Sequence, residues 1–234
     1  MNKPYVICHM VTTIDGRIMT EHWGESYEKF DGLYEECHNS FNSDAWMVGR
    51  VTMEVNFTEG LQPELVKPEK PIDRSAFVAN INASSFAIAV DPKGKLGWEE
   101  NEIEGDHIIE LLTESVADDY LYYLQKKNIS YILAGKDTAD FKLALEQLHD
   151  LFGIKTLMLE GGGHINGSLL NEGLIDELSL LILPLVDGTP KTPTTFEVSE
   201  YLKKNPATEL KLKEVQQLRN DVLWLKYGVA STVK

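Results

Sequence analysis

Three consecutive glycines, Gly161 to Gly163, follow a short apolar run and come directly before a segment that is typical of a helix. Glycine lets the backbone approach an anion closely, and the N–H groups of a first helical turn favour a phosphate. The dinucleotide-binding pattern Gly-x-Gly-x-x-Gly is not met, because Asn166 stands where its last glycine belongs. The spacing fits a phosphate site and a tight strand-to-helix turn equally well.

Two other turns combine the end of an apolar run with cationic residues. Gly49 ends one run and is followed by Arg50, which can hold a phosphate through two hydrogen bonds, and by Thr52, which can cap a helix. A later turn carries Lys93 and Lys95. Taken singly, such residues are usually only solvated charge. Three glycine-rich or cationic turns in an acidic chain nevertheless predict a site for a nucleotide with several phosphates.

Polar residues that could act on a substrate follow the apolar run at residues 5–11. Thr13 and Asp15 leave this run with a hydroxyl and a carboxylate, and Glu160 follows another apolar run in the same way. Open α/β sheets bind their ligands at such carboxyl ends of strands. Asp15 with Gly16 is also a common turn signal, so a purely structural role stays open.

The composition excludes several classes of protein. The chain has 234 residues with 22 Lys and Arg against 37 Asp and Glu, and a net charge of −15 does not suit binding to a nucleic-acid backbone. Its two cysteines, Cys8 and Cys37, cannot form a disulfide framework or a four-cysteine zinc site, and we expect no metal. The sequence contains neither a phosphate loop, nor a nucleophile elbow, nor the zinc-deaminase pattern. Its apolar runs are too short for a membrane span, so we expect a cytoplasmic protein.

Apolar periodicity predicts the elements that position these turns. We expect strands at residues 5–11, 45–48, 86–90, 108–112, 129–134, 154–159 and 178–186, and helices at residues 27–41, 115–127, 138–152 and 164–171. Ser115 is the expected N-cap of the second helix, and three prolines make residues 58–74 a loop. The alternation of strands and helices, followed by an antiparallel hairpin at residues 209–218 and 222–229, indicates an α/β fold with a mixed sheet. The length suits a single domain over residues 1–234.

In their order along the chain, these segments resemble one family, the riboflavin-pathway pyrimidine reductases. The similarity runs from residue 4 to residue 230 and is carried by residues 13–17, 44–52, 91–95, 159–163 and 168–188. These enzymes form the C-terminal reductase part of the bifunctional deaminase–reductase. The resemblance implies the dihydrofolate reductase-like fold: a three-layer α/β/α domain with a mixed, mostly parallel sheet, a C-terminal antiparallel hairpin and no deaminase domain.

The resemblance also implies a reaction and a cofactor. The family uses NADPH to reduce the ribosyl C1′ of 5-amino-6-(5-phosphoribosylamino)uracil, which gives the ribitylamino product of riboflavin biosynthesis. By position in the family, the cofactor would be bound by Gly49, Arg50, Thr52, Gly161, Gly162 and Gly163, with Lys93 or Lys95 at the adenosine 2′-phosphate. The substrate-side positions would be Thr13, Asp15, Ser26 and Glu160. Of these, Asp15 and Glu160 would be the catalytic positions, which orient the substrate or pass a proton.

Two departures from the family keep other functions open. His9 stands where the first strand of the family usually has a lysine, and no basic residue occurs between Arg50 and Lys67, where the family grips the substrate phosphate. One alternative is a reductase of the same fold that acts on a pterin, a folate or another heterocycle. The other is a non-catalytic nucleotide-binding protein, against which the presence of Asp15 and Glu160 argues.

The expected partners are a small heterocyclic substrate, NADPH and a second copy of the chain. The family pairs its subunits through the sheet region, and the C-terminal strand with Leu223, Trp224, Leu225 and Tyr227 would otherwise expose an apolar edge. Neither a nucleic acid nor a membrane is an expected partner. In the family's pathway, a separate protein would then carry out the deamination.

Overall fold

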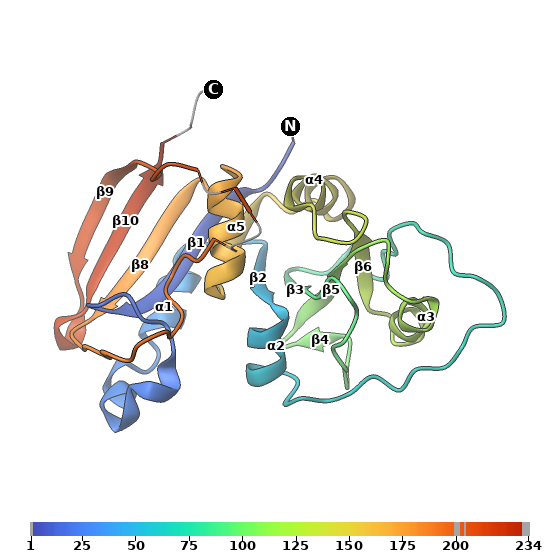
Figure 1. Ribbon diagram of the computed structural model, residues 1–234, viewed down its shortest axis with the longest axis horizontal. Helices are drawn as coiled ribbons and strands as arrows, with labels where there is room; N and C mark the ends of the chain where they lie inside the picture. Colours follow the sequence, from blue (N-terminus) through green and yellow to red (C-terminus); the bar gives the residue numbers. More distant parts are fainter. Residues whose placement is uncertain (1, 199–201, 204, 231–234) are drawn as a thin grey trace. The chain divides into compact units, whose positions relative to one another are not determined.

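The computed structural model describes residues 2–198, 202–203 and 205–230 (Figure 1). These residues form two compact units. The first contains the described residues up to Pro4 and Ser43–Leu157, and the second contains the described residues of Tyr5–Asn42 and Met158–Lys234. The boundary falls within β7 (Thr156–Leu159). A single domain over residues 1–234 stays a prediction.

The first unit is organised around a mixed sheet. Its strands are β2 (Ala45–Gly49), β3 (Phe86–Val90), β4 (Glu102–Ile103), β5 (Asp106–Leu112) and β6 (Ser130–Leu133). β2 pairs in parallel with β3, β3 with β5 and β5 with β6, while β4 pairs antiparallel with β5. Every residue of β2 and β3 is buried, which explains why both strands have continuous apolar sequences.

Three α-helices belong to the same unit: α2 (Arg50–Asn56), α3 (Asp118–Lys126) and α4 (Phe141–Phe152). α3 and α4 both pack beside β6 (Figure 1). The carboxylate of Asp140 caps α4 by accepting a hydrogen bond from the N–H of Leu143 at 3.0 Å. The helix ends at Gly153, whose φ of 70° is costly for other residues. The helix therefore begins three residues after the predicted start at residue 138, whereas its end at residue 152 is as predicted.

Sheet structure in the second unit includes β1 (Tyr5–Thr13), β8 (Glu177–Leu183), β9 (Leu210–Gln217) and β10 (Leu223–Val229). β1 pairs in parallel with β8, while β10 pairs antiparallel with both β8 and β9. β9 and β10 are the predicted C-terminal hairpin. The mixed α/β class, with mostly parallel pairing and antiparallel strands at the end of the chain, is confirmed.

An aromatic core lies between this sheet and the segments η2 (Gly24–Phe30, a 3-10 helix) and α1 (Leu33–Asn39). Its buried residues are Trp23, Phe30, Leu33, Cys37, Leu181, Leu183, Val222 and Trp224. Because side chains alternate along a strand, Leu180 and Ile182 point to the opposite face of β8 and are only partly buried. The continuous apolar sequence of this strand would predict burial on both faces, and this expectation is wrong.

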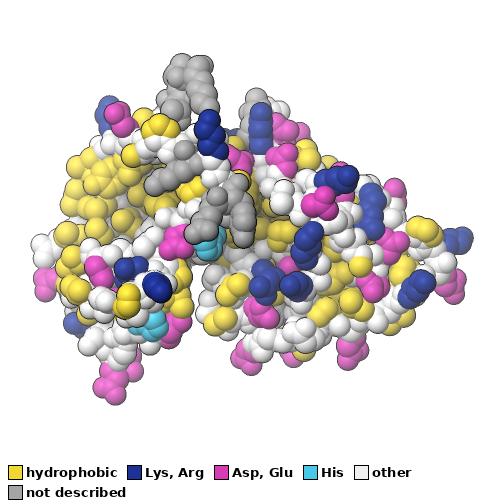
Figure 2. Space-filling view, viewed as in Figure 1, with side chains coloured by type: hydrophobic (Ala, Val, Ile, Leu, Met, Phe, Trp, Pro, Cys, Tyr) yellow, Lys and Arg dark blue, Asp and Glu magenta, His cyan; other side chains and the backbone are white. Residues whose placement is uncertain are grey.

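The opposite face of the C-terminal strands is apolar and exposed. Leu212, Val215 and Leu223 are 51%, 53% and 41% exposed. Leu225 lies across from Val215, and Tyr227 lies across from Leu212. Figure 2 shows hydrophobic side chains gathered over β9 and β10. We call these five residues the apolar sheet face.

Three local predictions are wrong. The helix expected at residues 27–41 is broken into η2 and α1, because Gly32 between them adopts a φ of 75°. Ser115 does not cap α3, which begins only at Asp118, since the Ser115 hydroxyl is hydrogen-bonded to that of Thr113. Thr52 is not a cap either, because it lies inside the first turn of α2.

The helix α5 (Gly163–Asn171) packs against residues 194–197 with no room for a side chain. A Cβ at Gly163 would stand less than 3.0 Å from the carbonyl oxygen of Thr194. A Cβ at Gly167 would stand less than 3.0 Å from the backbone of Glu197. Glycine at both positions is therefore a requirement of packing.

Gly167→Ala should destabilise the protein, although alanine favours a helix by about 1 kcal/mol over glycine. The added methyl group must displace the backbone of Glu197, and overpacking of this kind costs about 1–3 kcal/mol. We expect a lower midpoint of thermal unfolding. Ser168→Ala, at the neighbouring half-buried position, is the control and should leave the midpoint unchanged. A Gly167→Ala midpoint at or above that of the wild type would contradict the close packing.

Candidate functional site

Two of the predicted phosphate-binding turns lie at the same edge of the first unit's sheet. Gly49 at the end of β2 pairs with Val90 at the end of β3, so Arg50 and Asp91 begin neighbouring turns. Burial raises the pKa of Asp91, and the positive charges of Arg50 and Lys95 act in the opposite direction. The structure thus brings Gly49, Arg50 and Lys95 close together.

The carboxylate of Asp91 organises the second of these turns. It accepts hydrogen bonds from the backbone N–H groups of Lys95 and Leu96, the latter at 2.9 Å. The side chains of Lys93 and Lys95 are exposed, and the ammonium of Lys93 donates to the hydroxyl of Ser115 at 2.9 Å. Two accessible cations therefore stand on a turn whose backbone is fixed.

Arg50 is already paired with a carboxylate. Its guanidinium contacts Glu54 one helical turn further along α2, and the side chains are 31% and 33% exposed. An exposed ion pair of this kind is worth at most about 1 kcal/mol, so it does not prevent Arg50 from binding a phosphate. Gly49 precedes Arg50 with extended backbone, and Thr52 follows within the same turn.

The glycine turn of the second unit follows β7. Gly161 has a φ of 102°, which a residue with a side chain rarely adopts. Gly162 is the N-cap of α5, and Gly163 is its first residue. The packing against Thr194 requires glycine at position 163. The glycine at this position is therefore explained without a bound phosphate. Phosphate binding by the three glycines stays a prediction.

Asp15 holds a loop in place. Its Oδ1 accepts hydrogen bonds from the hydroxyl of Thr13 at 2.6 Å and from the N–H of Asp187 at 3.1 Å, and its Oδ2 accepts one from the N–H of Gly188 at 2.9 Å. These hydrogen bonds, that of Thr13 above all, lower the pKa of Asp15 to about 2. The carboxylate is therefore ionised at neutral pH and has no proton to donate.

Ser26 is not joined to the other substrate-side residues. It lies on η2, and its side chain is exposed. Within the described part of the second unit, no hydrogen bond links it to Thr13, Asp15 or Glu160. A role of Ser26 in substrate binding stays a prediction.

Glu160 has a partner that sequence reasoning missed. Its Oε1 lies 2.7 Å from Nδ1 of His38 on α1, and the two side chains are 12% and 22% exposed. The residues are 122 positions apart in the chain, so neither spacing nor periodicity connects them. Only the folded chain brings this imidazole next to the carboxylate that precedes the glycine turn.

His9, which replaces the family's lysine, is fully buried. Its Nε2 lies 3.2 Å from the carbonyl oxygen of Tyr34, and its Nδ1 lies 2.9 Å from Oγ of Ser179. Burial lowers the pKa of His9 and favours the neutral ring. Because a carbonyl oxygen only accepts hydrogen bonds, Nε2 carries the proton and Nδ1 accepts from Ser179. His9 is therefore a core residue whose two ring nitrogens both have hydrogen-bond partners.

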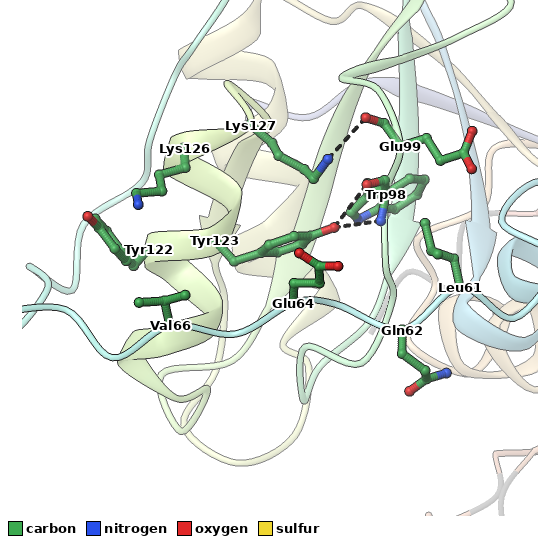
Figure 3. A pocket seen from close by; sticks show the side chains of 10 residues that line it. All are labelled: Leu61, Gln62, Glu64, Val66, Trp98, Glu99, Tyr122, Tyr123, Lys126 and Lys127. Carbon is green, nitrogen blue, oxygen red and sulfur yellow. Dashed lines mark hydrogen bonds between the residues drawn. The ribbon is translucent and has the colours of Figure 1, made fainter.

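Figure 3 shows a pocket of about 460 Å³ in the first unit. Its aromatic wall is fixed, because the hydroxyl of Tyr123 accepts from the N–H of Trp98 at 2.6 Å and donates to the carbonyl of Trp98 at 3.1 Å. Lys127 donates to the carbonyl of Glu99 at 3.0 Å. Among the described residues that line this pocket, none is a predicted site residue. Pocket size alone therefore does not locate the candidate site.

The described residues also lack two other kinds of feature. No group of three or more His, Cys, Asp or Glu side chains there could hold a metal ion. No helix in this part of the chain is both long and apolar enough to cross a membrane.

The fold is that of the dihydrofolate reductase-like α/β proteins, the class that the resemblance implies. The family model for the RibD C-terminal domain matches residues 4–224, and the chain belongs to this family.

Two relatives extend over nearly the whole chain. The 2,5-diamino-6-ribosylamino-4(3H)-pyrimidinone 5′-phosphate reductase of Methanothermobacter thermautotrophicus is 28% identical over 227 residues, which are 94% of this chain and 96% of the relative. The reductase of the same name from Aquifex aeolicus is 26% identical over 218 residues, which are 91% of each chain. The chain is thus similar in length as well as in sequence to these proteins.

Solved structures support the same fold. A pyrimidine reductase-like protein from Corynebacterium diphtheriae has a TM-score of 0.68 at 19% identity, covering 97% of this chain and 92% of that one. Rib7 from Saccharomyces cerevisiae has a TM-score of 0.61 at 15% identity, covering 97% and 90%. RibD from Acinetobacter baumannii has a TM-score of 0.64 at 18% identity, and this chain covers 58% of it.

Asp15→Asn should lower the midpoint of thermal unfolding by a few degrees at neutral pH. Asparagine has one acceptor oxygen, whereas both carboxylate oxygens of Asp15 accept backbone hydrogen bonds. The change is therefore not neutral for the turn, contrary to what an Asx turn alone would predict. Because the folded-state pKa is depressed, the stabilisation by Asp15 is present above the unfolded-state pKa of 3.8 and is lost as the pH falls through about 2.

The two midpoints should converge as the pH approaches 2, which calorimetry over a pH series can follow. Asp137→Asn, on an exposed loop of the first unit, is the matched control and should unfold like the wild type throughout. Equal midpoints for Asp15→Asn and the wild type at neutral pH would mean that these hydrogen bonds do not hold the loop.

Proposed function

We propose that this chain is an NADPH-dependent oxidoreductase that reduces a ribosylamino-pyrimidine 5′-phosphate to its ribitylamino form in riboflavin biosynthesis. The observation that carries the proposal is the match to reductases of that name over nearly the full length of both chains. Their names favour 2,5-diamino-6-ribosylamino-4(3H)-pyrimidinone 5′-phosphate as the substrate. The uracil expected from the sequence differs from it by an oxo group in place of one amino group.

The cationic groups of the first unit fit a dinucleotide phosphate. Arg50 is only partly engaged by Glu54, and Lys93 and Lys95 are exposed cations on an ordered turn. Such groups form charge-assisted hydrogen bonds with phosphate oxygens. We assign the cofactor phosphates to these cations, and phosphate binding by the glycine turn at residues 161–163 stays a separate prediction. When bound, NADPH supplies the hydride that reduces C1′.

The two predicted catalytic carboxylates take different roles in this proposal. Asp15 is ionised and held by hydrogen bonds from Thr13 and two backbone N–H groups, so it orients the substrate. Glu160 is the carboxylate that holds or moves a proton. The reduction adds a hydride to C1′ and a proton to the sugar ring oxygen, as the bond between these two atoms breaks.

The cofactor assignment predicts that NADPH binds more tightly than NADH. One charge-assisted hydrogen bond to the 2′-phosphate is worth about 1.5–3 kcal/mol, which corresponds to about 10- to 150-fold in affinity. In a fluorescence titration, Lys93→Gln or Lys95→Gln should lose this factor for NADPH and leave the affinity for NADH unchanged. Lys155→Gln, at another exposed position of the first unit, is the control. Equal affinities of the wild type for the two cofactors would contradict the assignment of Lys93 or Lys95 to the 2′-phosphate.

The reaction itself is tested by following the absorbance of NADPH with each candidate substrate. Either pyrimidine ribosylamine phosphate should accelerate NADPH oxidation by the purified protein, whereas dihydrofolate and dihydropterin should not. Oxidation with dihydrofolate alone would favour the heterocycle alternative. NADPH binding without oxidation by any of them would favour a non-catalytic nucleotide-binding protein.

We also infer a homodimer formed through the apolar sheet face. Leu212, Val215 and Leu223 are each more than 40% exposed, and exposed apolar patches of this kind mark interaction sites. In a two-fold dimer the same face serves both subunits, so no second complementary surface is needed. The occupant of this face is therefore a second copy of the chain.

Light scattering at micromolar concentration should give about twice the chain mass of 26.4 kDa. Leu212→Lys should give the monomer mass, because a charge in the centre of an apolar interface remains without a partner. Leu143→Lys, which replaces an exposed leucine on α4, should remain dimeric. A monomeric wild type would remove the basis of this inference.

A further inference from the structure

The pair of Glu160 and His38 is built into the second unit. Glu160 comes directly after β7, and His38 lies near the end of α1. Their hydrogen bond of 2.7 Å joins Oε1 of the carboxylate to Nδ1 of the imidazole. Both side chains are mostly buried, so water competes little for this contact.

A buried network holds α1 in place beneath this pair. The indole N–H of Trp224 donates to Oγ of Ser179 at 2.8 Å, and the Ser179 hydroxyl donates to Nδ1 of His9. Nε2 of His9 donates to the carbonyl of Tyr34, which lies one helical turn before His38. In the other direction, the Tyr34 hydroxyl donates to the carbonyl of His9 at 3.0 Å. Each polar atom of these rings has a partner, so the position of α1 is fixed.

Three other titratable side chains, Cys8, His9 and Tyr34, lie near Glu160 and His38. From β1, burial raises the pKa of the Cys8 thiol and lowers that of His9, so both are neutral at pH 7. From α1, burial and the charge of Glu160 raise the pKa of Tyr34 well above its usual value. His38 is the imidazole that lies within hydrogen-bonding distance of Glu160, and imidazole is the side chain type that ordinarily gains and loses a proton near neutral pH.

We propose that His38 is the positioning residue for Glu160: it orients the carboxylate and shares with it the proton that the reduction of C1′ consumes. This inference rests on the function proposed above. The pair carries one proton on the bond between Nδ1 and Oε1. That proton passes through Glu160 to the sugar ring oxygen as its bond to C1′ breaks, which leaves a carboxylate and a neutral imidazole. Water then returns one proton to the pair.

Two substitutions separate orientation from proton storage. His38→Asn keeps an N–H donor near the position of Nδ1 but cannot take up a proton, whereas His38→Ala loses both properties. We expect kcat to fall about 10²-fold in His38→Ala, the usual size of a lost proton-transfer role, and less in His38→Asn. The fall of kcat at alkaline pH, where the pair has lost its proton, should disappear from the pH profile of both variants. The Kd for NADPH and the midpoint of thermal unfolding should not change.

His149→Gln is the matched control, because Nδ1 of His149 lies 2.8 Å from Oδ1 of Asp150 on the surface of the first unit. It should behave as the wild type in every assay. Wild-type kcat and an unchanged pH profile in His38→Ala would overturn the role of His38.

A second measurement does not depend on turnover. In NMR titrations of the histidine rings, Glu160→Gln should lower the pH at which His38 titrates, because the carboxylate stabilises the protonated imidazole. His149 should titrate as before. An unmoved His38 titration would overturn the pairing even in an active enzyme. A moved titration in a protein that reduces no pyrimidine would instead refute the proposed function and leave the pairing intact.

Discussion

The candidate site of the second unit depends on how one segment, residues 185–197, is held by the chain around it. At one end, the Asp15 carboxylate accepts hydrogen bonds from two backbone N–H groups of this segment. In its middle, Arg17 donates to a backbone carbonyl at 2.6 Å. At the other end, Gly163 approaches its backbone, and the Asn166 amide donates to it at 3.0 Å. The turn after β1 and the glycine turn after β7 thus both contact the backbone of residues 185–197.

This arrangement separates the two acidic residues that the sequence treats alike. Both carboxylate oxygens of Asp15 accept hydrogen bonds from the backbone of this segment, and the group is ionised at neutral pH. Asp15 is therefore a fixed negative charge. Glu160 faces an imidazole and shares a hydrogen bond with it. The two carboxylates thus differ in their environment, which is the property that separates the roles of paired carboxylates in enzymes.

Continuous apolar runs were sufficient to predict β2 and β3, because every residue of both strands is buried. The C-terminal hairpin was predictable from the turn between its two strands, since β9 itself is mostly exposed. Helix boundaries were less predictable: Gly32 breaks an amphipathic pattern that otherwise fits one helix. The order of motifs indicated the family, yet it could not show that His9 is buried or that Asp15 accepts hydrogen bonds from the backbone of residues 187 and 188. The pairing of His38 with Glu160 could not be predicted from the sequence, since the two residues are 122 positions apart.

The central claim is that this chain transfers a hydride to the ribosyl carbon of a pyrimidine ribosylamine phosphate. Deuterium transfer tests it most directly, because it follows the atom and not the absorbance of the cofactor. The protein is incubated with the substrate and NADPH labelled with deuterium at C4, in separate samples for each face of the ring. We expect one label to yield a ribitylamino product with a single deuterium at C1′, as read by mass spectrometry and NMR. A product without deuterium from either label, or no product, would contradict it.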